Sequence, residues 1–318
     1  MEISIVVVNR NSKSFVNKLI RTLINSCSNY YNCKEIIIVD NGSTDGSLEI
    51  YRSYAKNINE PEIKVVPLGR NTGFCYATNM GVRLARSELV AILNPDLYVD
   101  ADWLRPIMED FEKMPRLGVV QPLIYWYQKP EEIQATGLYM DLAGNYRANV
   151  FGSKTLLAPF GAAYVVRRSA FLEIGGLDPF YFMYHDEVDL GLRMWLAGWL
   201  VMLEPKSRVY HYMGGVTPQA PYIRFLKVML ARRNQIFTLV KALSITWLFV
   251  SLFLLSLVNI IRMIKSKEIV RAVISAYYDI IRNIRYVALQ RQMFSKKRKL
   301  NEKKLSWWGI IRPLGEGQ

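Results

Sequence analysis

Three carboxylates and a histidine lie within five consecutive positions of this 318-residue chain. Positions 185–189 read His-Asp-Glu-Val-Asp and precede a segment with apolar residues at helical spacing. Acidic side chains are favourable at a helix start because they face its partial positive charge, so capping accounts for some of them. Three acids beside the aromatic, glycine-rich positions 175–182 exceed what capping requires. We therefore expect one carboxylate of this cluster to act as a general base.

Two further polar clusters follow apolar, strand-like runs. Positions 40–45 read DNGSTD, in which Asn-Gly supplies turn geometry while carboxylates and hydroxyls present hydrogen-bonding groups. Positions 94–96 read Asn-Pro-Asp, and Asp96 beside a bound diphosphate could hold Mg²⁺ or Mn²⁺. Each cluster taken alone is equally compatible with a simple turn between two elements.

The chain has only two histidines, His185 and His211. His185 adjoins the acidic cluster, and His211 follows a strand-like run. A lone histidine is more often structural, but both of these occupy polar motif positions, so a role in a site and a structural role stay open.

The elements that must position these residues alternate along the first 100 positions. Because parallel strands with helices on both faces bind ligands beyond their carboxyl ends, this alternation places the polar clusters at one edge of a doubly wound, mostly parallel sheet. We expect strands at 3–8, 35–39, 63–66 and 89–93, and helices at 14–27, 47–55 and 73–86.

The segment from about 118 to 211 is less regular, and we interpret it as the acceptor half of the same domain. It contains three strand-like runs and one clear helix. The strands are expected at 119–127, 162–166 and 199–203, and the helix at 188–196.

The C-terminal segment differs from the rest in charge and hydropathy. Positions 242–261 carry no charge over 20 residues, about the length that crosses a bilayer, and basic residues flank them on both sides. A basic helical stretch follows at 268–294. Roughly +11 of the net charge of +14 falls after residue 235. We expect a spanning or deeply embedded helix, with a core helix or a dimerisation helix as the alternatives.

Composition excludes several classes of protein. With 51% hydrophobic and 21% charged residues, the chain is not disordered. Because the basic excess belongs to the C-terminal segment, it favours anionic lipid and not nucleic acid as the partner. Cys27, Cys33 and Cys75 form an odd set without a CxxC spacing, so we expect neither a zinc ribbon nor a disulfide framework, and a reducing compartment. The sequence lacks a GxGxxG fingerprint after the first strand and a GxSxG elbow, which disfavours nicotinamide-dependent enzymes and α/β-hydrolases.

In their order and spacing, the motifs together resemble the family 2 glycosyltransferases of the GT-A fold, in the rhamnosyltransferase-like branch. The resemblance covers about residues 1–235. It rests on positions 5–10 (IVVVNR), 40–45 (DNGSTD), 71–74 (NTGF) with Asn79, 93–96 (LNPD), 160–163 (FGAA), 175–178 (GGLD), 183–190 (MYHDEVDL) with Arg193 and Gly198, His211, and 233–234 (RN).

The resemblance implies a GT-A catalytic domain at 1–235. The uncharged run and the basic charge beyond it predict a membrane-associated helical tail at 236–318. The resemblance also implies a nucleotide-sugar donor, Mg²⁺ or Mn²⁺, and inversion at the anomeric carbon. Asp96 corresponds to the metal-binding carboxylate of the family's DxD-type motif, with His211 as a weaker candidate ligand, and Asn94 stands where many relatives have Asp. The residues expected to contact the nucleotide or line the donor pocket are Asn9, Asp40, Asn41, Asp45, Asn71, Gly73, Asn79 and Asn94.

The family's catalytic acid pair commonly reads Glu-Asp, and Asp186-Glu187 stands in its place. By alignment Glu187 takes the position of the base, and Asp186 is its close competitor. Asp189 is expected to pair with Arg193, four residues on, as an exposed ion pair of small energy.

The resemblance and the tail together imply a glycosyltransferase at the cytoplasmic face of the cell membrane. The acceptor would be a lipid-linked saccharide or glycan, and the transferred sugar could be rhamnose. Two alternatives stay open: a transferase that acts directly on a polyprenyl phosphate, and an inactive membrane-bound scaffold. A processive synthase is disfavoured because no QxxRW motif is present.

Overall fold

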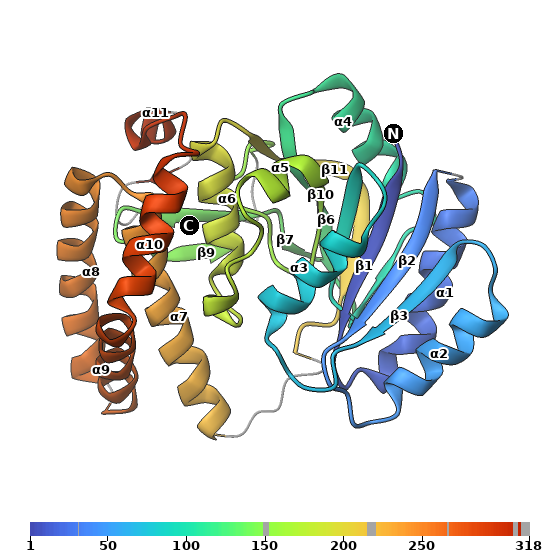
Figure 1. The fold of residues 1–318 in the computed structure, drawn as a ribbon, viewed down its shortest axis with the longest axis horizontal. Coiled ribbons are helices and arrows are strands. Elements are labelled where there is room, and N and C mark those ends of the chain that lie inside the picture. Colours follow the sequence, from blue (N-terminus) through green and yellow to red (C-terminus); the bar gives the residue numbers. More distant parts are fainter. Residues whose placement is uncertain (31, 149–152, 215–220, 266, 308–310, 313–318) are drawn as a thin grey trace.

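A large mixed sheet lies at the centre of the computed structural model, with helices on both of its faces (Figure 1). The structure describes residues 1–30, 32–148, 153–214, 221–265, 267–307 and 311–312. The strands are β1 (Ile3–Asn9), β2 (Cys33–Asp40), β3 (Glu62–Pro67), β4 (Leu89–Leu93), β5 (Leu97–Val99), β6 (Leu117–Trp126), β7 (Ile133–Ala135), β8 (Leu138–Asp141), β9 (Tyr146–Ala148), β10 (Ala163–Arg167), β11 (Leu200–His211) and β12 (Ile311–Arg312).

The helices fall into two groups, one around the sheet and one that forms a separate C-terminal layer (Figure 1). The first group is α1 (Lys13–Asn29), α2 (Ser47–Asn57), α3 (Phe74–Leu84), α4 (Leu104–Lys113), α5 (Arg168–Glu173) and α6 (Asp186–Leu196). The second group is α7 (Pro221–Ala242), α8 (Ile245–Lys265), α9 (Lys267–Arg282), α10 (Ile284–Ser295) and α11 (Glu302–Trp307).

The central sheet has the strand order β3-β2-β1-β4-β10-β6-β11-β5, and β7 pairs with β6. β3, β2, β1 and β4 are parallel neighbours, and β11 is parallel to β6, which confirms the predicted mostly parallel α/β fold. β10 is antiparallel to both of its neighbours, β4 and β6. Every residue of β1 is buried because helices cover both faces of the sheet.

The expected strands and helices of the first 100 residues all occur, with ends shifted by a few residues. The expected strand at 199–203 is instead the first part of β11, which continues to His211. Its second half contains the polar residues Lys206, Ser207 and Arg208 and a register shift against β6, so the sequence lacks a continuous strand pattern there. β8, β9 and β12 form a small second sheet that the sequence analysis did not anticipate.

The C-terminal helices depart from the expected single span. α7 runs without a break across residue 235, and the apolar run begins only at Ile245, as α8. The basic stretch at 268–294 is two helices, because Asn283 ends α9 with its side chain bonded to the carbonyl of Asp279 (2.8 Å). The division at 235 therefore stays a prediction, although the helix that crosses it is continuous. Positions 266, 308–310 and 313–318 of the expected tail lie outside the described residues.

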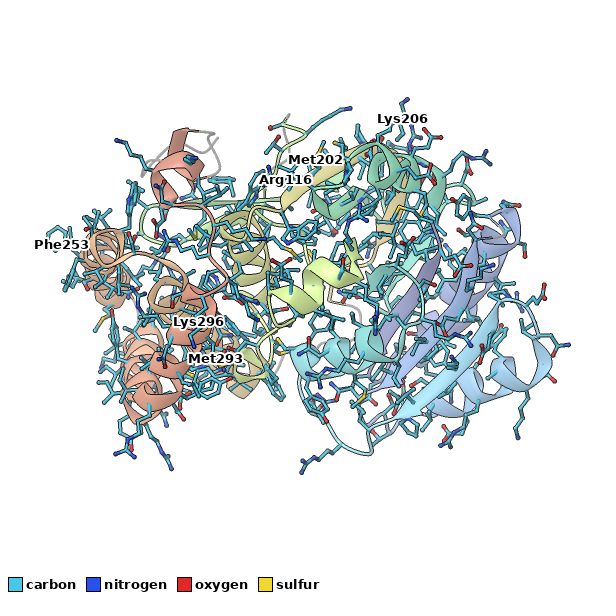
Figure 2. The ribbon with its side chains drawn as sticks, turned by 45° about the horizontal axis from the view of Figure 1, so that its top comes forward. Arg116, Met202, Lys206, Phe253, Met293 and Lys296 are labelled. Carbon is cyan, nitrogen blue, oxygen red and sulfur yellow. A yellow bond between two sulfur atoms is a disulfide. The ribbon has the colours of Figure 1, made fainter. Side chains whose placement is uncertain are left out.

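By length and composition, α8 is long and apolar enough to cross a membrane. Only 17% of its apolar stretch is buried inside the protein. Its buried side chains, Ser251, Leu255 and Asn259, are spaced four residues apart and form one stripe. The opposite face is exposed, and Phe253 lies at the outer edge of the molecule (Figure 2). α8 therefore packs through one face against α7 and α9 and leaves an apolar face uncovered.

The prediction about the cysteines was wrong for one pair. Cys27 near the end of α1 and Cys33 at the start of β2 form a disulfide, while Cys75 is free and buried. The chain reverses direction between these two elements and brings the two Cα atoms to 5.0 Å. This proximity results from the turn between α1 and β2 and not from a spacing motif. Neither the spacing nor the odd number of cysteines therefore predicted the disulfide. The cysteine content therefore gives no support for a reducing compartment.

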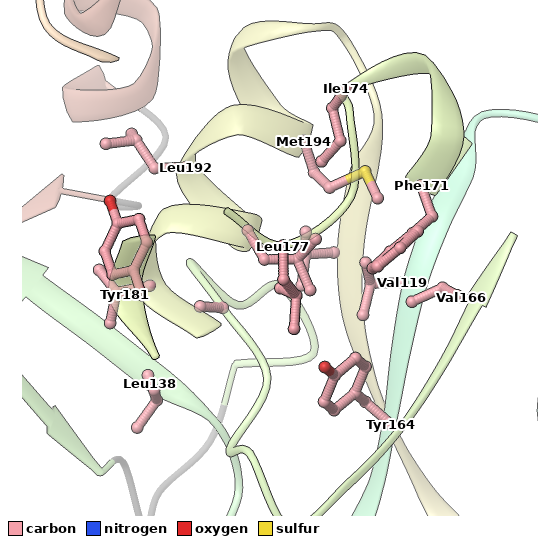
Figure 3. Packing of buried hydrophobic residues seen from close by; sticks show 14 of the residues in the cluster. Val119, Leu138, Tyr164, Val166, Phe171, Ile174, Leu177, Tyr181, Leu192 and Met194 are labelled. Carbon is pink, nitrogen blue, oxygen red and sulfur yellow. The ribbon is translucent and has the colours of Figure 1, made fainter. Parts of the chain in front are cut away.

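The sheet face that carries α3 and α6 shares one apolar cluster with the C-terminal helices. Leu177, which precedes the loop before α6, lies at its centre, with Met194 of α6 on one side and Tyr164 of β10 on the other (Figure 3). Phe237 of α7 is fully buried in the same cluster and stacks on Tyr181, with ring centroids 5.2 Å apart. The C-terminal layer is thus packed into the core.

Four buried charges reinforce this junction. Asp189 of α6 accepts a hydrogen bond from Arg193 Nε (2.8 Å) and pairs with Lys241 Nζ of α7 (2.8 Å). Lys241 also lies 3.3 Å from Asp178. Burial alone would raise the pKa of Asp189, but the charges of Arg193 and Lys241 lower it to about 2. The expected pairing with Arg193 is present, but the pair is buried and not exposed, because α7 covers it.

Replacing Lys241 with methionine should lower the free energy of unfolding by about 3–5 kcal/mol, since it leaves two buried carboxylates short of one positive charge. Lys113→Met is the matched control, because Lys113 is 69% exposed and pairs with Glu109 in a single helix turn. Thermal and urea unfolding of both variants would measure the difference. A loss below 1 kcal/mol for Lys241→Met, or equal losses in both variants, would contradict a structural role for the buried charges.

Candidate active site

The carboxyl ends of β1 and β2 carry a group of mutually bonded polar side chains. Asn9 Nδ2 donates to Asp40 Oδ1 (2.7 Å), Ser43 Oγ (3.0 Å) and Ser47 Oγ (3.1 Å). Asp40 Oδ2 in turn accepts from the backbone N–H of Ser43 (3.1 Å). Asn9 and Asp40 are buried, so these bonds hold the loop after β2 in one shape at the ligand-binding edge of the sheet.

Asp45 closes this loop onto the start of two helices. Its carboxylate accepts from the backbone N–H of Lys13 (2.8 Å) and from the N–H (3.0 Å) and hydroxyl (2.6 Å) of Ser47. Partial burial would raise its pKa, but these hydrogen bonds favour the charged form and lower it. Asp45 is therefore a fixed negative charge beside the loop, already committed to protein donors.

Asn41 joins the loop after β2 to the segment before α3. Its Oδ1 accepts from the N–H (2.7 Å) and hydroxyl (2.9 Å) of Thr72, and its Nδ2 donates to Asn71 Oδ1 (3.1 Å). Asn41 and Asn71 thus meet as expected for residues that line one pocket. Gly73, which follows, has a φ of +85°, and a side chain there would overlap Phe182.

Asn79 of α3 binds the backbone before the loop that leads to α6, a contact that was not expected from the sequence. Its Nδ2 donates to the carbonyl of Leu177 (2.6 Å), and its Oδ1 accepts from the N–H of the same residue (2.9 Å). Both polar atoms of the buried amide are therefore used to hold the backbone ahead of the catalytic loop.

Asp96 and His211 meet because β5 and β11 are antiparallel neighbours, with His211 opposite Leu97. His211 Nε2 lies 3.3 Å from Asp96 Oδ1, and both side chains are buried. His211 Nδ1 lies 2.8 Å from Gln134 Oε1, which can only accept, so this ring nitrogen carries the proton. Asn94 is half-buried at the same strand end, and its N–H donates to the carbonyl of Ala162 (2.9 Å).

This donor pair fits a divalent cation. His211 Nε2 lies 3.3 Å from a carboxylate oxygen, so the two atoms either share a proton or could both contact one cation from the same side. Gln134 orients the imidazole from its other nitrogen, as partners of metal-bound histidines commonly do. Among the described residues no group of three or more His, Cys, Asp or Glu side chains could hold a metal. A bound diphosphate and water would therefore complete the coordination of Mg²⁺ or Mn²⁺.

The loop before α6 is held in an unusual conformation. Phe182, Tyr184 and His185 all have positive φ (64°, 69° and 65°), a region that costs non-glycine residues energy. Asn234 of α7 offsets that cost, because its Nδ2 lies within 3.0 Å of the carbonyls of Tyr181, Met183 and Tyr184. α7 therefore determines the shape of the loop that positions the acidic cluster.

Asp186 and Glu187 at the start of α6 differ in exposure. Asp186 is 2% exposed, and its Oδ2 has no hydrogen-bond partner among the described residues, whereas Glu187 is only half-buried. Burial raises the pKa of both, and the neighbouring charge of Glu187 raises that of Asp186 further. Glu187 is therefore the better placed of the two to be both ionised and accessible.

One short segment connects the acidic cluster to the metal-binding pair. A side chain at Gly161 would overlap the Glu187 carboxylate, which therefore rests directly on this residue. Phe160 packs edge-on against His211, with ring centroids 6.3 Å apart. Ala162 bonds to the backbone of Asn94. Residues 160–162 thus contact both the Glu187 carboxylate and the residues around the Asp96–His211 pair.

His185 does not join the candidate metal ligands. It is 1% exposed, neither ring nitrogen has a partner among the described residues, and burial lowers its pKa to about 3, so it is neutral. Its ring lies 5.2 Å from that of Tyr146. Gln134, Tyr146 and Gly161 were not expected at the site, and of these only Gly161 lies in one of the motifs, FGAA at 160–163.

Residues 4–175 match the family profile described as Glycosyl transferase family 2. An N-acetylglucosaminyl-diphospho-decaprenol L-rhamnosyltransferase from Mycobacterium tuberculosis is 28% identical over 217 residues, which cover 58% of this chain and 69% of that protein. GalNAc-T7 with UDP, GalNAc and Mn²⁺ superposes with a TM-score of 0.61 at 18% identity, over 75% of this chain and 47% of that chain.

The mannosyltransferase PcManGT from Pyrobaculum calidifontis, with GDP-Man and Mn²⁺, superposes with a TM-score of 0.57 at 13% identity. That alignment covers 97% of this chain and 83% of the other. At these identities both solved structures support the fold alone. They support a GT-A-like sheet, and the coverage by PcManGT extends beyond the sheet into the C-terminal helices.

Replacing Asp96 with alanine should abolish Mn²⁺ binding in the presence of a nucleoside diphosphate, because it removes one of two protein ligands and the only carboxylate of the pair. His211→Ala should weaken binding less, since the carboxylate remains. Electron paramagnetic resonance of Mn²⁺ would measure both, with Asp102→Ala as a control at an exposed carboxylate. Unchanged Mn²⁺ binding by a folded Asp96→Ala protein would refute the assignment.

Proposed function

Because the chain belongs to glycosyl transferase family 2 and is a glycosyltransferase, we propose that it transfers a sugar from a nucleotide-diphosphate donor to a lipid-linked saccharide, with inversion at the anomeric carbon. The observation that carries the proposal is that one short segment, residues 160–162, contacts both Glu187 and the surroundings of the Asp96–His211 pair. One group can receive a proton where the other can bind a diphosphate.

The proposed donor site lies at the carboxyl ends of β1, β2 and β4. Asn41, Asn71 and the loop held by Asn9 and Asp40 would contact the nucleotide. Asp96 and His211 would hold Mg²⁺ or Mn²⁺ at the diphosphate. When bound, the cation neutralises the negative charge that the departing nucleoside diphosphate gains. Two solved structures of the same fold were determined with UDP or GDP-Man and Mn²⁺, the class of donor and cation that is proposed here.

The proposed reaction is a single displacement. An acceptor hydroxyl is a poor nucleophile at neutral pH, so Glu187 takes its proton as the hydroxyl oxygen bonds to the anomeric carbon. The bond from that carbon to the phosphate oxygen breaks on the opposite face, and the electron pair leaves with the nucleoside diphosphate. Asp186, buried and with its pKa strongly raised, is the neutral neighbour that leaves Glu187 as the ionised member of the pair.

We propose rhamnose as the sugar and a polyprenyl-diphosphate saccharide as the acceptor class. The support is the name of the mycobacterial relative, which acts on an N-acetylglucosaminyl-diphospho-decaprenol acceptor. The alternative, direct transfer to a polyprenyl phosphate, differs in the acceptor and is separated by assaying both lipids.

We further propose that α8 attaches the protein to the cytoplasmic face of the membrane and lies along its surface. The exposed face of α8 includes Phe249 (71% exposed) and Phe253 (64% exposed). Because the opposite stripe is packed against α7 and α9, a helix that crossed the bilayer alone would have to leave those contacts. Exposed arginines on α9 favour anionic headgroups. They are Arg271 and Arg282.

Glu187→Gln should reduce turnover about 10²–10⁴-fold, because it removes the proton acceptor while it keeps the size of the side chain. Donor affinity should stay close to that of the wild type. Turnover is measured as nucleotide release and sugar transfer, and donor affinity by calorimetry. Glu109→Gln, at an exposed site, is the control.

Because burial raises the pKa of Glu187, kcat/KM should fall with decreasing pH at a higher pH than an ordinary glutamate would give. Near-normal turnover by Glu187→Gln together with an inactive Asp186→Asn would transfer the role of base to Asp186. No transfer by the wild type to any lipid acceptor, with donor binding intact, would favour the inactive scaffold.

The double substitution Phe249→Glu and Phe253→Glu should reduce binding to phosphatidylglycerol vesicles at least tenfold, since each exposed ring contributes about 1.5–3 kcal/mol when it enters an apolar medium. Leu84→Glu on α3 is the control, because Leu84 is also exposed (43%) but belongs to a helix that packs on β1 and β2. Vesicle flotation measures binding. Wild-type protein that stays soluble without detergent and does not bind vesicles would contradict membrane attachment. The exposed face of α8 would then be a contact surface for another protein.

A further inference from the structure

Two arginines from different helices meet beside the turn between β8 and β9. Arg232 of α7 and Arg262 of α8 each direct a guanidinium Nη1 at the same atom, Asn145 Oδ1, at 3.4 and 3.1 Å. Gln235 Nε2 approaches the same oxygen at 3.3 Å. An amide oxygen has two lone pairs, so three donors exceed what it can accept.

Neither guanidinium forms an ion pair with a carboxylate among the described residues, and Arg232 Nη1 donates to Gln235 Oε1 (2.6 Å). Burial lowers the pKa of Arg262, although the charge of Asp141 acts in the opposite direction and raises it. The Asp141 carboxylate already accepts from the N–H groups of Ala143 and Asn145 (each 2.9 Å) and from the Asn145 amide. Burial, followed by the charge of Arg262, lowers the pKa of Arg232 to about 10. An anion site typically brings positive charges together in a half-buried position and offers N–H donors that the protein leaves unused. Arg232 and Arg262 have both features.

This arginine pair lies between the catalytic loop and the apolar face of α8. On one side, Tyr146 follows Asn145 in the chain and packs against His185, the residue before the acidic pair. On the other side, Arg262 is flanked on α8 by Ile261 (58% exposed) and Ile264 (82% exposed). An anion bound here would have the base on one side and an uncovered apolar surface on the other.

We propose that Arg232 and Arg262 bind the diphosphate of the lipid-linked acceptor. This rests on the proposed function and names the group by which the acceptor is held. The diphosphate replaces the missing carboxylates, the lipid chain follows the exposed face of α8, and the saccharide extends past Tyr146 toward Glu187. The ligand class is therefore a prenyl diphosphate, and neither a neutral glycan nor the diphosphate of the donor belongs at this position.

The test compares Arg262→Gln with Arg285→Gln, a matched loss of one exposed positive charge on α10. The purified full chain in detergent is titrated calorimetrically with farnesyl diphosphate. Arg262→Gln should weaken binding about tenfold to a hundredfold, because it removes charge-assisted hydrogen bonds, and Arg285→Gln should leave it unchanged. Arg232→Gln should act in the same direction. If that more buried variant fails to fold, Arg262→Gln alone decides the outcome.

A kinetic measurement separates binding from a structural effect. With a saccharide linked through diphosphate to a short prenyl chain, Arg262→Gln should raise KM by a similar factor and change kcat little. With the same saccharide on a neutral alkyl chain, wild type and variant should behave alike. Equal losses with both acceptors, or an equal loss in Arg285→Gln, would overturn the proposal.

The source of the anion is distinguished with phosphatidylglycerol vesicles. If Arg262→Gln weakens vesicle binding but leaves farnesyl diphosphate binding unchanged, the pair binds a phospholipid headgroup and the proposal is wrong. Arg262-dependent binding of farnesyl diphosphate without transfer to any diphosphate-linked saccharide would refute the proposed function and leave the site intact. Transfer that is unaffected by Arg262→Gln would refute the site and leave the function intact.

Discussion

The buried charges of Asp189, Arg193 and Lys241 determine where the start of α6 lies. Arg193 uses its remaining nitrogens on the carbonyls of Ile174 (2.9 Å) and Gly176 (2.8 Å), so the glycine-rich segment, α6 and α7 meet at one point. Charges that are removed from water are costly when unpaired, so this arrangement tolerates little displacement of any element. The orientation of Glu187, two residues before Asp189, therefore depends on a lysine that belongs to the C-terminal helices. The catalytic loop and the C-terminal layer behave as one structural unit.

The first half of the fold could be predicted from sequence because its signals are local. The run of β-branched residues before Asn9 and the polar turn after Asp40 mark a buried strand and its end without reference to the rest of the chain. The same is true of the acidic cluster at the start of α6. The roles of Asn79 and Asn234 could not be predicted, because each amide is defined by backbone carbonyls far away in sequence. The exposure of the Asp189–Arg193 pair was misjudged for the same reason, since α7 covers it.

The polar residues at the strand ends fall into two classes that the sequence does not separate. Asn9, Asp40 and Asp45 use much of their hydrogen-bonding capacity within the protein. Their bonds fix the shape of the loop after β2 before any ligand binds. Asp96 and His211 instead present an oxygen and a nitrogen 3.3 Å apart that could both contact one cation. Both classes are polar residues after buried strands, and only the placement of their partners distinguishes a group that builds a pocket from one that binds within it.

Only Leu243 and Ser244 separate α7 from α8, and α7 is anchored in the core on one side of this junction. The apolar face of α8 is therefore held at a constant height relative to Glu187. If that face rests on a bilayer, Glu187 lies at a fixed distance from the membrane surface. An acceptor whose reactive hydroxyl lies at the same distance can react, whereas the product, longer by one sugar, carries its new hydroxyl at a different distance. This geometry would limit the enzyme to one sugar addition per acceptor.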